Sequence, residues 1–227
     1  MLDNWVAEIL VDPITKLPTT PGGIGLKDGV IDARRYLRNT AGFHNWNEGQ
    51  QAYEAWDARA IENYRAEIDG VAPVYDHFRM GGRVLDVGGG AGTVRHFLPG
   101  GTEFVSVDPF IDYLKGIPPQ KRLSYPCLEQ HLNFIPACAE FLPFQYCSFD
   151  WVHMRSRLDH VQSTDLALME AHRVLKPAGH LVIGLNVDGG KSGKRTLERQ
   201  LKEIARTLLV ACGVTRFKDH HTFHHRT

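Results

Sequence analysis

From residue 82 onward, short apolar segments alternate with longer amphipathic ones, and this alternation strongly limits the folds open to the chain. Buried strands are predicted at 83–87, 104–107, 132–136, 149–154 and 181–185, with a short helix at 93–98. Alternating strands and helices are typical of a parallel sheet whose crossover helices cover its faces. The sequence therefore predicts an α/β domain.

Two amphipathic segments after residue 160 predict further helices. The first, at about 164–175, carries the apolar residues Leu166, Leu168, Met169 and Val174, which we expect to face the sheet. A turn at 176–179 is expected to end it. The second helix is predicted at about 193–212, where Leu197, Leu201, Ile204 and Leu208 recur at helical spacing.

The chain before residue 79 differs in composition. Proline and glycine are dense between residues 12 and 30, which predicts an irregular segment over 1–44. Residues 45–78 carry aromatic side chains at helical spacing and predict a cover of two helices, broken near Gly70 and Pro73. We expect its aromatic residues Trp46, Tyr53 and Trp56 to pack against the sheet, with an apolar lid over a ligand site as the alternative. The main domain is predicted at 79–213, followed by a His-rich tail at 214–227.

Overall composition excludes several classes of partner and compartment. Lys plus Arg and Asp plus Glu both number 26, so no net charge attracts nucleic acid or anionic lipid. The four cysteines form no C-x-x-C pair, which indicates reduced thiols rather than a zinc site. No signal peptide is evident, and no apolar run reaches the roughly 20 residues of a membrane helix. We expect a cytoplasmic protein.

The glycine-rich turn after the first strand indicates a ligand site. Gly88, Gly90 and Gly92 permit a tight turn and a close approach of ligand to backbone, at the sheet edge where open α/β folds bind ligands. Asp108 ends the second strand, where a carboxylate can accept hydrogen bonds from both hydroxyls of a ribose. Together they predict a nucleotide-like cofactor; the alternative is a loop glycine cluster beside a surface aspartate.

Charge at the turn distinguishes between two such cofactors. A dinucleotide site has the pattern G-x-G-x-x-G, with pyrophosphate at the helix N-terminus, but Thr93 stands at the third glycine position. Asp86 precedes the first glycine by two residues and would repel a pyrophosphate. S-adenosylmethionine has no phosphate and carries an ammonium and a sulfonium cation. The turn therefore favours S-adenosylmethionine over NAD.

Four segments resemble the motifs of class I S-adenosylmethionine-dependent methyltransferases: VLDVGGGAG at 84–92, ACAEFLPF at 137–144, SFDWV at 148–152 and EAHRVLKPAG at 170–179. The resemblance covers residues 80–187, with the motifs in the family's order. It implies a doubly wound parallel sheet of order 3-2-1-4-5 and methyl transfer to a small molecule, with S-adenosylhomocysteine as product.

The resemblance also assigns residues to the cofactor. They are Asp86, Gly88, Gly89, Gly90 and Gly92 for the methionine end, Asp108 for the ribose, Pro109, Phe110, Cys138, Ala139 and Glu140 around the adenine, and Met154 with Arg155 beside the methyl group. The family often has an aspartate where Cys138 stands. This departure leaves open a weaker affinity, or substitution by Glu140 or a water molecule.

No general base is assigned, because methyl transfer from a sulfonium chiefly requires alignment and exclusion of water. His153 and His160 flank the expected acceptor site, but local packing is the preferred interpretation of each. Two alternatives to a methyltransferase remain: a protein that binds the cofactor without turnover, and an NAD-dependent oxidoreductase.

Residues 9–16 faintly resemble a small zinc ribbon, but Asp12 and Thr15 stand where its cysteines would be, so no metal is expected there. The histidines at 220–225 are interpreted as an incidental tail, with metal or substrate contact as the alternative. The family's final strand pair is not evident in the sequence. The chain is then either a fragment or leaves an open sheet edge, through which two copies could pair.

Overall fold

The computed structural model describes residues 2–20, 23, 26–27, 30–31, 61–89, 92–109, 131, 133–156, 158 and 160–185. Residues 1–185 form one compact unit and residues 186–227 a second. The predicted helix at 193–212, the His-rich tail and residues 45–60 of the helical cover lie outside the described residues. No helix in the described ranges is long and apolar enough to cross a lipid bilayer.

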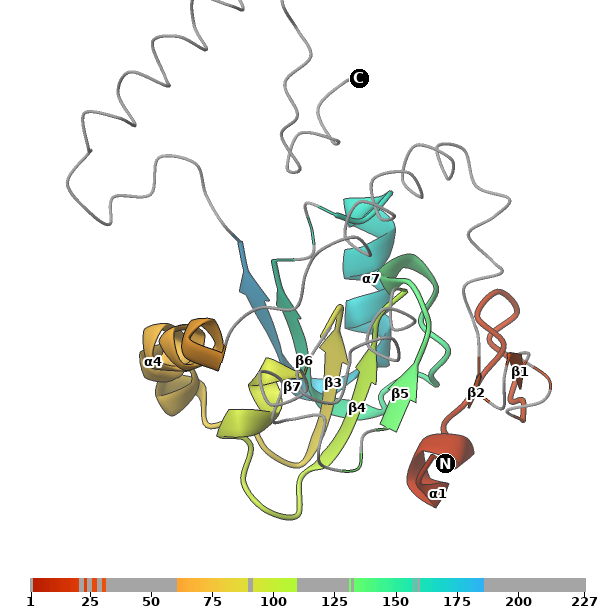
Figure 1. Ribbon diagram of the computed structural model, residues 1–227. Helices are drawn as coiled ribbons and strands as arrows, with labels where there is room; N and C mark the ends of the chain where they lie inside the picture. The colour runs from red at the N-terminus through yellow and green to blue at the C-terminus, as the bar shows by residue number, and fades with distance from the viewer. Residues whose placement is uncertain are drawn as a thin grey trace, which may run out of the picture. The chain divides into compact units, whose positions relative to one another are not determined.

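A five-stranded parallel sheet forms the centre of the first unit (Figure 1). Its strands are β3 (Arg83–Val87), β4 (Glu103–Val107), β5 (Asn133–Ile135), β6 (Phe149–Arg155) and β7 (Leu175–Gly184). They are hydrogen-bonded in the order β5-β4-β3-β6-β7, and every pairing is parallel. Numbered within the sheet, this order is 3-2-1-4-5. The predicted fold class is confirmed.

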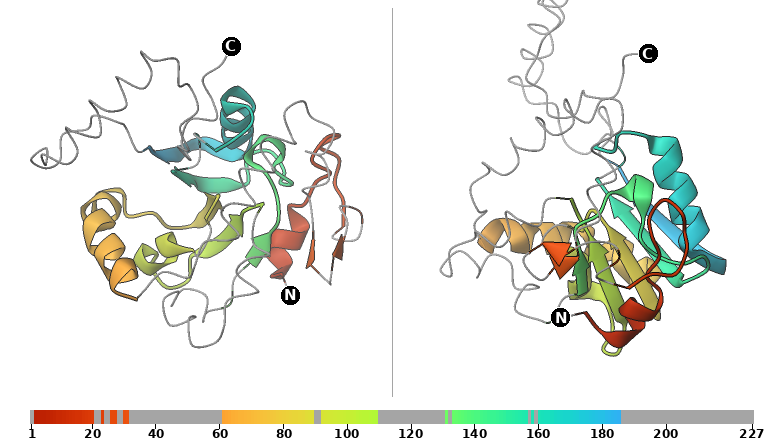
Figure 2. Two further views of the ribbon diagram at one scale, coloured as in Figure 1. Left: turned by 45° about the horizontal axis from the view of Figure 1, so that its top comes forward. Right: turned by 90° about the vertical axis from the view of Figure 1, so that its right-hand side faces the viewer.

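The two faces of the sheet bury different sets of side chains, because successive residues of a strand point to opposite faces. Leu85 and Val87 of β3 belong to a large apolar core that also takes side chains from α1 (Asn4–Glu8) and α7 (Thr164–Val174). Val84 points the other way, into a smaller core with α4 (Ile61–Phe78) and the 3-10 helix η2 (Thr93–Phe97). Figure 2 shows α4 and α7 on opposite sides of the sheet.

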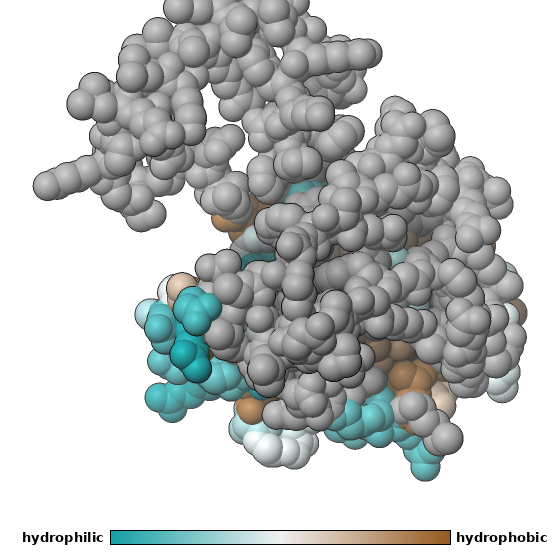
Figure 3. Space-filling model, viewed as in Figure 1, coloured by the Kyte–Doolittle hydropathy of each residue, from teal (hydrophilic) through white to brown (hydrophobic). Residues whose placement is uncertain are grey.

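Helix α4 continues through Gly70 and Pro73, so the predicted break between two helices is wrong. A proline inside a helix removes the N–H that would bond to the carbonyl four residues earlier. Here both Pro73 and Asp69 are exposed, so water can solvate the freed carbonyl. Buried side chains on the opposite face anchor the helix on either side of this point, while its outer face is hydrophilic (Figure 3).

Helix α7 has the predicted position, but part of its predicted inner face is wrong. Leu166 and Met169 are 43% and 66% exposed. The buried residues are Ala167, Glu170, Ala171 and Val174. The small alanines let the helix backbone lie close to the sheet, and Glu170 is held there by ionic partners described below. Ser163 caps the helix, accepting a hydrogen bond from Leu166 N at 3.4 Å.

Strand β7 follows α7 directly, so the expected separate turn at 176–179 is instead part of the strand. Its pairing with β6 is irregular between Phe149 and Trp151, and Ala178 has a φ of 63°. The predicted buried strand at 181–185 is only partly buried, and Val182 is its one buried residue. Within the described residues β7 is an outer strand, and pairing of two copies at this edge stays a prediction.

The N-terminal segment packs on the main core and contains a short hairpin-like turn. Val11 N donates to Pro143 O at 3.1 Å, and Gln145 N donates to Ile9 O at 2.8 Å. Asp12 Oδ1 accepts from the backbone N–H groups of Ile14 and Thr15, at 2.9 and 2.8 Å. The Asp12 carboxylate thereby stabilises the turn through hydrogen bonds to its backbone. Further on, β1 (Leu26–Lys27) and β2 (Val30–Ile31) pair antiparallel.

Candidate active site

The carboxyl ends of β3 and β4 bring the glycine turn and Asp108 to one edge of the sheet. Val87 and Val107 are register partners, and Gly88 N donates to Val107 O at 2.6 Å. Asp108, which follows Val107 directly, is 2% exposed. Because the strands are parallel and in this register, residues 20 positions apart in sequence become neighbours. The expected meeting of turn and acid is present.

The turn itself requires glycine at specific positions. Gly88 and Gly92 both have a φ of 72°, in the left-handed region that glycine adopts without strain. A Cβ at Gly89 would overlap Asp86 Oδ2 and Ser106 Oγ, two side-chain atoms that lie beneath the turn. Gly90 and Phe110, two predicted cofactor residues, lie outside the described residues, and Pro109 is half-buried.

Asp86 is in β3, and its buried carboxylate contacts a histidine of the next strand. His153 Nδ1 lies 2.7 Å from Asp86 Oδ1, and His153 Nε2 lies 2.8 Å from the hydroxyl of Tyr75 in α4. All three residues are 5% exposed or less. This agrees with local packing for His153. Tyr75 was missed by the sequence analysis, although it lies seven residues after Ile68 on the buried stripe of α4.

Burial raises the pKa of Tyr75, while the nearby Arg155 guanidinium acts in the opposite direction. The hydroxyl therefore stays protonated at neutral pH. Its hydrogen bond with Nε2, and that of Nδ1 with Asp86 Oδ1, hold the imidazole ring at both nitrogens.

The segment after β5 holds the residues predicted to lie near an adenine. Cys138 is 3% exposed and Ala139 is 7% exposed; the latter begins the 3-10 helix η4 (Ala139–Phe141). Glu140 Oε1 accepts hydrogen bonds from Gln162 N at 2.5 Å and Ser163 N at 3.2 Å. One carboxylate oxygen of Glu140 is thus already used to join this segment to the start of α7.

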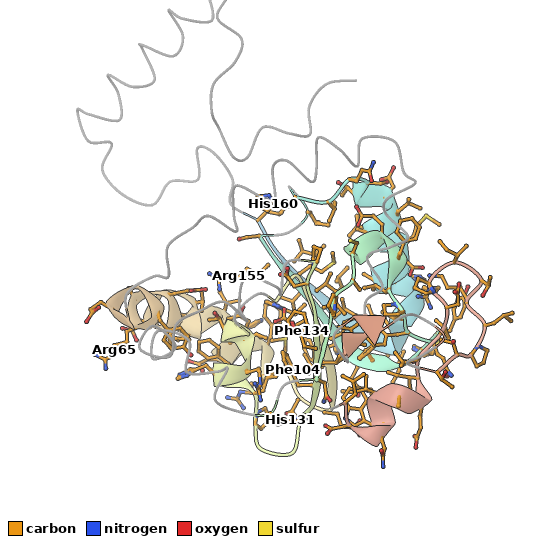
Figure 4. All side chains as sticks on the ribbon, turned by 45° about the vertical axis from the view of Figure 1, so that its right-hand side comes forward. Arg65, Phe104, His131, Phe134, Arg155 and His160 are labelled. Carbon is orange, nitrogen blue, oxygen red and sulfur yellow. The ribbon has the colours of Figure 1, made fainter. Side chains whose placement is uncertain are left out.

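The last two residues of β6 point to opposite faces of the sheet. Met154 is completely buried in the core shared with α7, so only its backbone could reach a ligand. Arg155 points to the α4 face, where its Nη1 lies 2.9 Å from Glu67 Oε1. Figure 4 shows Arg155 beside α4 and His160 beyond the carboxyl end of β6. His160 is half-buried.

The two buried acids define the chemistry that this edge can support. Asp86 and Asp108, each 2% exposed, end adjacent strands beside backbone that glycine leaves uncovered. Such a site suits a ligand with a cationic group and a pair of hydroxyls, and opposes an additional anion. S-adenosylmethionine has these groups. Among the described residues, no three His, Cys, Asp or Glu side chains are placed to hold a metal ion.

Comparison with known proteins agrees with this geometry. Residues 85–183 match the family described as methyltransferase domain. The ubiquinone/menaquinone biosynthesis C-methyltransferase UbiE of Allorhizobium ampelinum is 33% identical over 106 residues, covering 45% of this chain and 41% of that protein. The same enzyme of Pseudomonas aeruginosa is 31% identical over 159 residues, covering 68% and 57%.

The chain thus spans about half the length of the curated relatives it matches. Among solved structures, the protein PH0226 of Pyrococcus horikoshii aligns with 25% identity and a TM-score of 0.46, over 66% of this chain and 62% of that one. Strand order, glycine turn and family match agree: residues 85–183 of this chain are a methyltransferase domain of the class I S-adenosylmethionine-dependent family.

Proposed function

We propose that this protein transfers a methyl group from S-adenosylmethionine to a small-molecule acceptor at the carboxyl edge of β3 and β4. The observation that carries the proposal is the pair of buried carboxylates, Asp86 and Asp108, on either side of the glycine turn. A buried carboxylate is costly unless it is hydrogen-bonded or paired with a cation. A cationic ligand bearing a ribose would add a cation near Asp86 and two hydroxyl donors near Asp108.

Each residue of the edge has a proposed part in binding. Asp108 accepts hydrogen bonds from the two ribose hydroxyls, and Asp86 attracts the ammonium of the methionine end. Gly88, Gly89, Gly90 and Gly92 let the cofactor lie against the backbone, while Pro109, Phe110, Cys138 and Ala139 surround the adenine. The cofactor supplies the chemistry, a methyl group on a sulfonium leaving group. The protein aligns the acceptor with that methyl and excludes water.

A small-molecule acceptor, methylated at carbon, is supported by the names of the UbiE relatives, which are C-methyltransferases of ubiquinone and menaquinone biosynthesis. No described side chain is proposed as a general base. His153 and Tyr75 are 5% and 4% exposed, so neither presents its polar atoms to an acceptor.

Calorimetry with S-adenosylhomocysteine and with NAD tests the cofactor. We expect S-adenosylhomocysteine to bind and Asp108→Asn to weaken it by roughly 10-fold or more, because hydrogen bonds to a charged acceptor are lost. Asp76→Asn, which changes an exposed acid of α4, is the matched control. Equal affinity in the Asp108 variant, or binding of NAD instead, would contradict the assignment.

Binding without turnover is the second candidate, favoured by the buried Cys138 at a position where the family often has an acid. A methyl-release assay over a panel of quinol-like and other small acceptors separates the two. Product formation supports the enzyme, whereas binding without product over the whole panel supports the second candidate.

A further inference from the structure

Three buried polar side chains cross the sheet in one row, beside buried apolar residues on the same face. Asp86 of β3 is the register partner of both Ser106 of β4 and His153 of β6. Ser106 has no exposed surface, and His153 is 5% exposed. The buried neighbours on this face are Val84, Phe104 and Val182. Polar groups in such surroundings are costly unless they satisfy one another, so the row needs an explanation.

The two oxygens of Asp86 have different surroundings. Oδ1 lies 2.7 Å from His153 Nδ1. Oδ2 lies beneath Gly89, next to the place that a Cβ would occupy, and accepts no hydrogen bond from the residues that the structure describes. His153 therefore fixes the rotation of the carboxylate, with one oxygen on the imidazole and the other toward the glycine turn.

His153 is held between two polar partners, Asp86 at Nδ1 and Tyr75 at Nε2. The groups facing His153 are Asp86 of β3, Tyr75 of α4, Arg155 on the same face of β6, and Val182 of β7. Arg155 is neutralised by its ion pair with Glu67. Tyr75 contacts His153 Nε2 at 2.8 Å, so both ring nitrogens are engaged and the imidazole ring is fixed beside Asp86.

We propose that His153 and Tyr75 are positioning residues that hold the Asp86 carboxylate in one orientation, with Oδ2 directed at the ammonium of the bound cofactor. This inference rests on the proposed function, since it needs an adenosyl cofactor at the glycine turn. His153 supplies a hydrogen bond that a buried carboxylate needs, and Tyr75 holds the opposite side of the imidazole ring. Neither residue touches the reacting atoms.

Two ligands distinguish binding of the methionine end from binding of the rest of the cofactor. S-adenosylhomocysteine has the ammonium, whereas 5′-methylthioadenosine keeps the adenosine and sulfur without it. Calorimetry measures both ligands with the full chain and with His153→Phe, His153→Asn and Tyr75→Phe. Tyr64→Phe is the matched control, because Tyr64 is another buried tyrosine of α4 and packs away from His153.

We expect His153→Phe to bind S-adenosylhomocysteine about 10-fold more weakly, the equivalent of one charge-assisted hydrogen bond. Its affinity for 5′-methylthioadenosine should stay unchanged. His153→Asn places an amide N–H near the position of Nδ1 and should recover most of the loss. Tyr64→Phe should match the wild-type protein with both ligands.

Tyr75→Phe tests the second contact of the row without replacing the histidine. Without the tyrosine hydroxyl, His153 Nε2 loses a hydrogen-bond partner at 2.8 Å, and the imidazole is held less firmly beside Asp86. We expect this variant to bind S-adenosylhomocysteine more weakly than the wild-type protein, by less than His153→Phe does. Its affinity for 5′-methylthioadenosine should stay unchanged.

The outcomes are distinct. If wild-type protein binds neither ligand, the proposed function fails and this inference with it. If wild-type protein binds both, but His153→Phe and Tyr75→Phe bind S-adenosylhomocysteine as tightly, the inference alone is overturned. It is also overturned if the variants lose both ligands equally, which would indicate a structural role.

Discussion

Lys16 and Glu170 are 154 positions apart in sequence, yet Lys16 Nζ lies 2.7 Å from Glu170 Oε2. The same carboxylate accepts from Leu142 N at 2.9 Å and from Arg173 Nε at 2.7 Å. Arg173 in turn donates to the carbonyl oxygens of Phe144 and Leu142. Burial lowers the pKa of Lys16, and Glu170 opposes this shift. Glu170 therefore joins the N-terminal turn, the segment after η4 and helix α7.

Glu170→Gln should destabilise the protein far more than Lys16→Met. The first change leaves a buried guanidinium without its charged partner, which typically costs about 3 to 5 kcal/mol. The second removes a partly exposed ammonium and leaves the Arg173 contacts in place, so we expect about 1 kcal/mol. Urea unfolding of both variants measures the difference. Equal losses would show that the lysine, not the arginine, is the main partner of the carboxylate.

Gly89→Ala should destabilise the fold and weaken cofactor binding. The added Cβ would overlap Asp86 Oδ2 and Ser106 Oγ, and the hydrogen bond to His153 limits how far Asp86 can move. Overpacking of this kind costs about 1 to 3 kcal/mol. Gly100→Ala is the control, because a Cβ there would meet nothing within 4 Å. Thermal unfolding with and without S-adenosylhomocysteine measures both effects; two variants of equal stability would refute the steric argument.

Glu140→Gln should lower stability more than it lowers cofactor affinity. Glu140 Oε1 accepts from the N–H groups of Gln162 and Ser163, just before α7, where a negative charge also interacts favourably with the helix dipole. Loss of the charge should cost about 1 kcal/mol. Chemical unfolding measures stability, and calorimetry measures affinity for S-adenosylhomocysteine. A large loss of affinity in a stable variant would instead support direct contact between Glu140 and the adenine.

Asp150 should contribute to stability in a pH-dependent manner. Burial alone would raise its pKa, but hydrogen bonds from Lys176 Nζ and Arg83 N outweigh burial, and the pKa is lowered. A carboxyl pKa that is lower in the folded state stabilises the protein above the unfolded value, and this contribution is lost as pH falls through the folded value.

Asp150→Asn should therefore lower the free energy of unfolding at neutral pH, and the difference from wild type should vanish in acid, below the ordinary pKa of 3.8. Both side chains of the ion pair are 39% exposed, so we expect only about 0.5 kcal/mol. Urea unfolding over a pH series measures this. A difference in the free energy of unfolding that grows toward low pH would contradict this prediction.

Much of the fold was predictable because its signals are local. Segments rich in apolar residues, such as 83–87 and 149–154, are typical of the buried strands of a parallel sheet. The meeting of the glycine turn with Asp108 follows from where the two neighbouring strands end. The side of α7 that is buried against the sheet was not predictable in the same way. Its apolar residues lie all around the helix, and the closer packing of Ala167 and Ala171, with the ionic contacts of Glu170, decides which side is buried.

By itself, the sequence determined the α/β class and the approximate positions of most strands, and it predicted a ligand at the glycine turn, since each depends on residues close together along the chain. Only the tertiary structure decided that Asp86, His153 and Tyr75 form one hydrogen-bonded row. Their contact depends on the register of β3 against β6 and on where α4 packs. Both are set by the summed packing of side chains from distant segments, which no local pattern encodes.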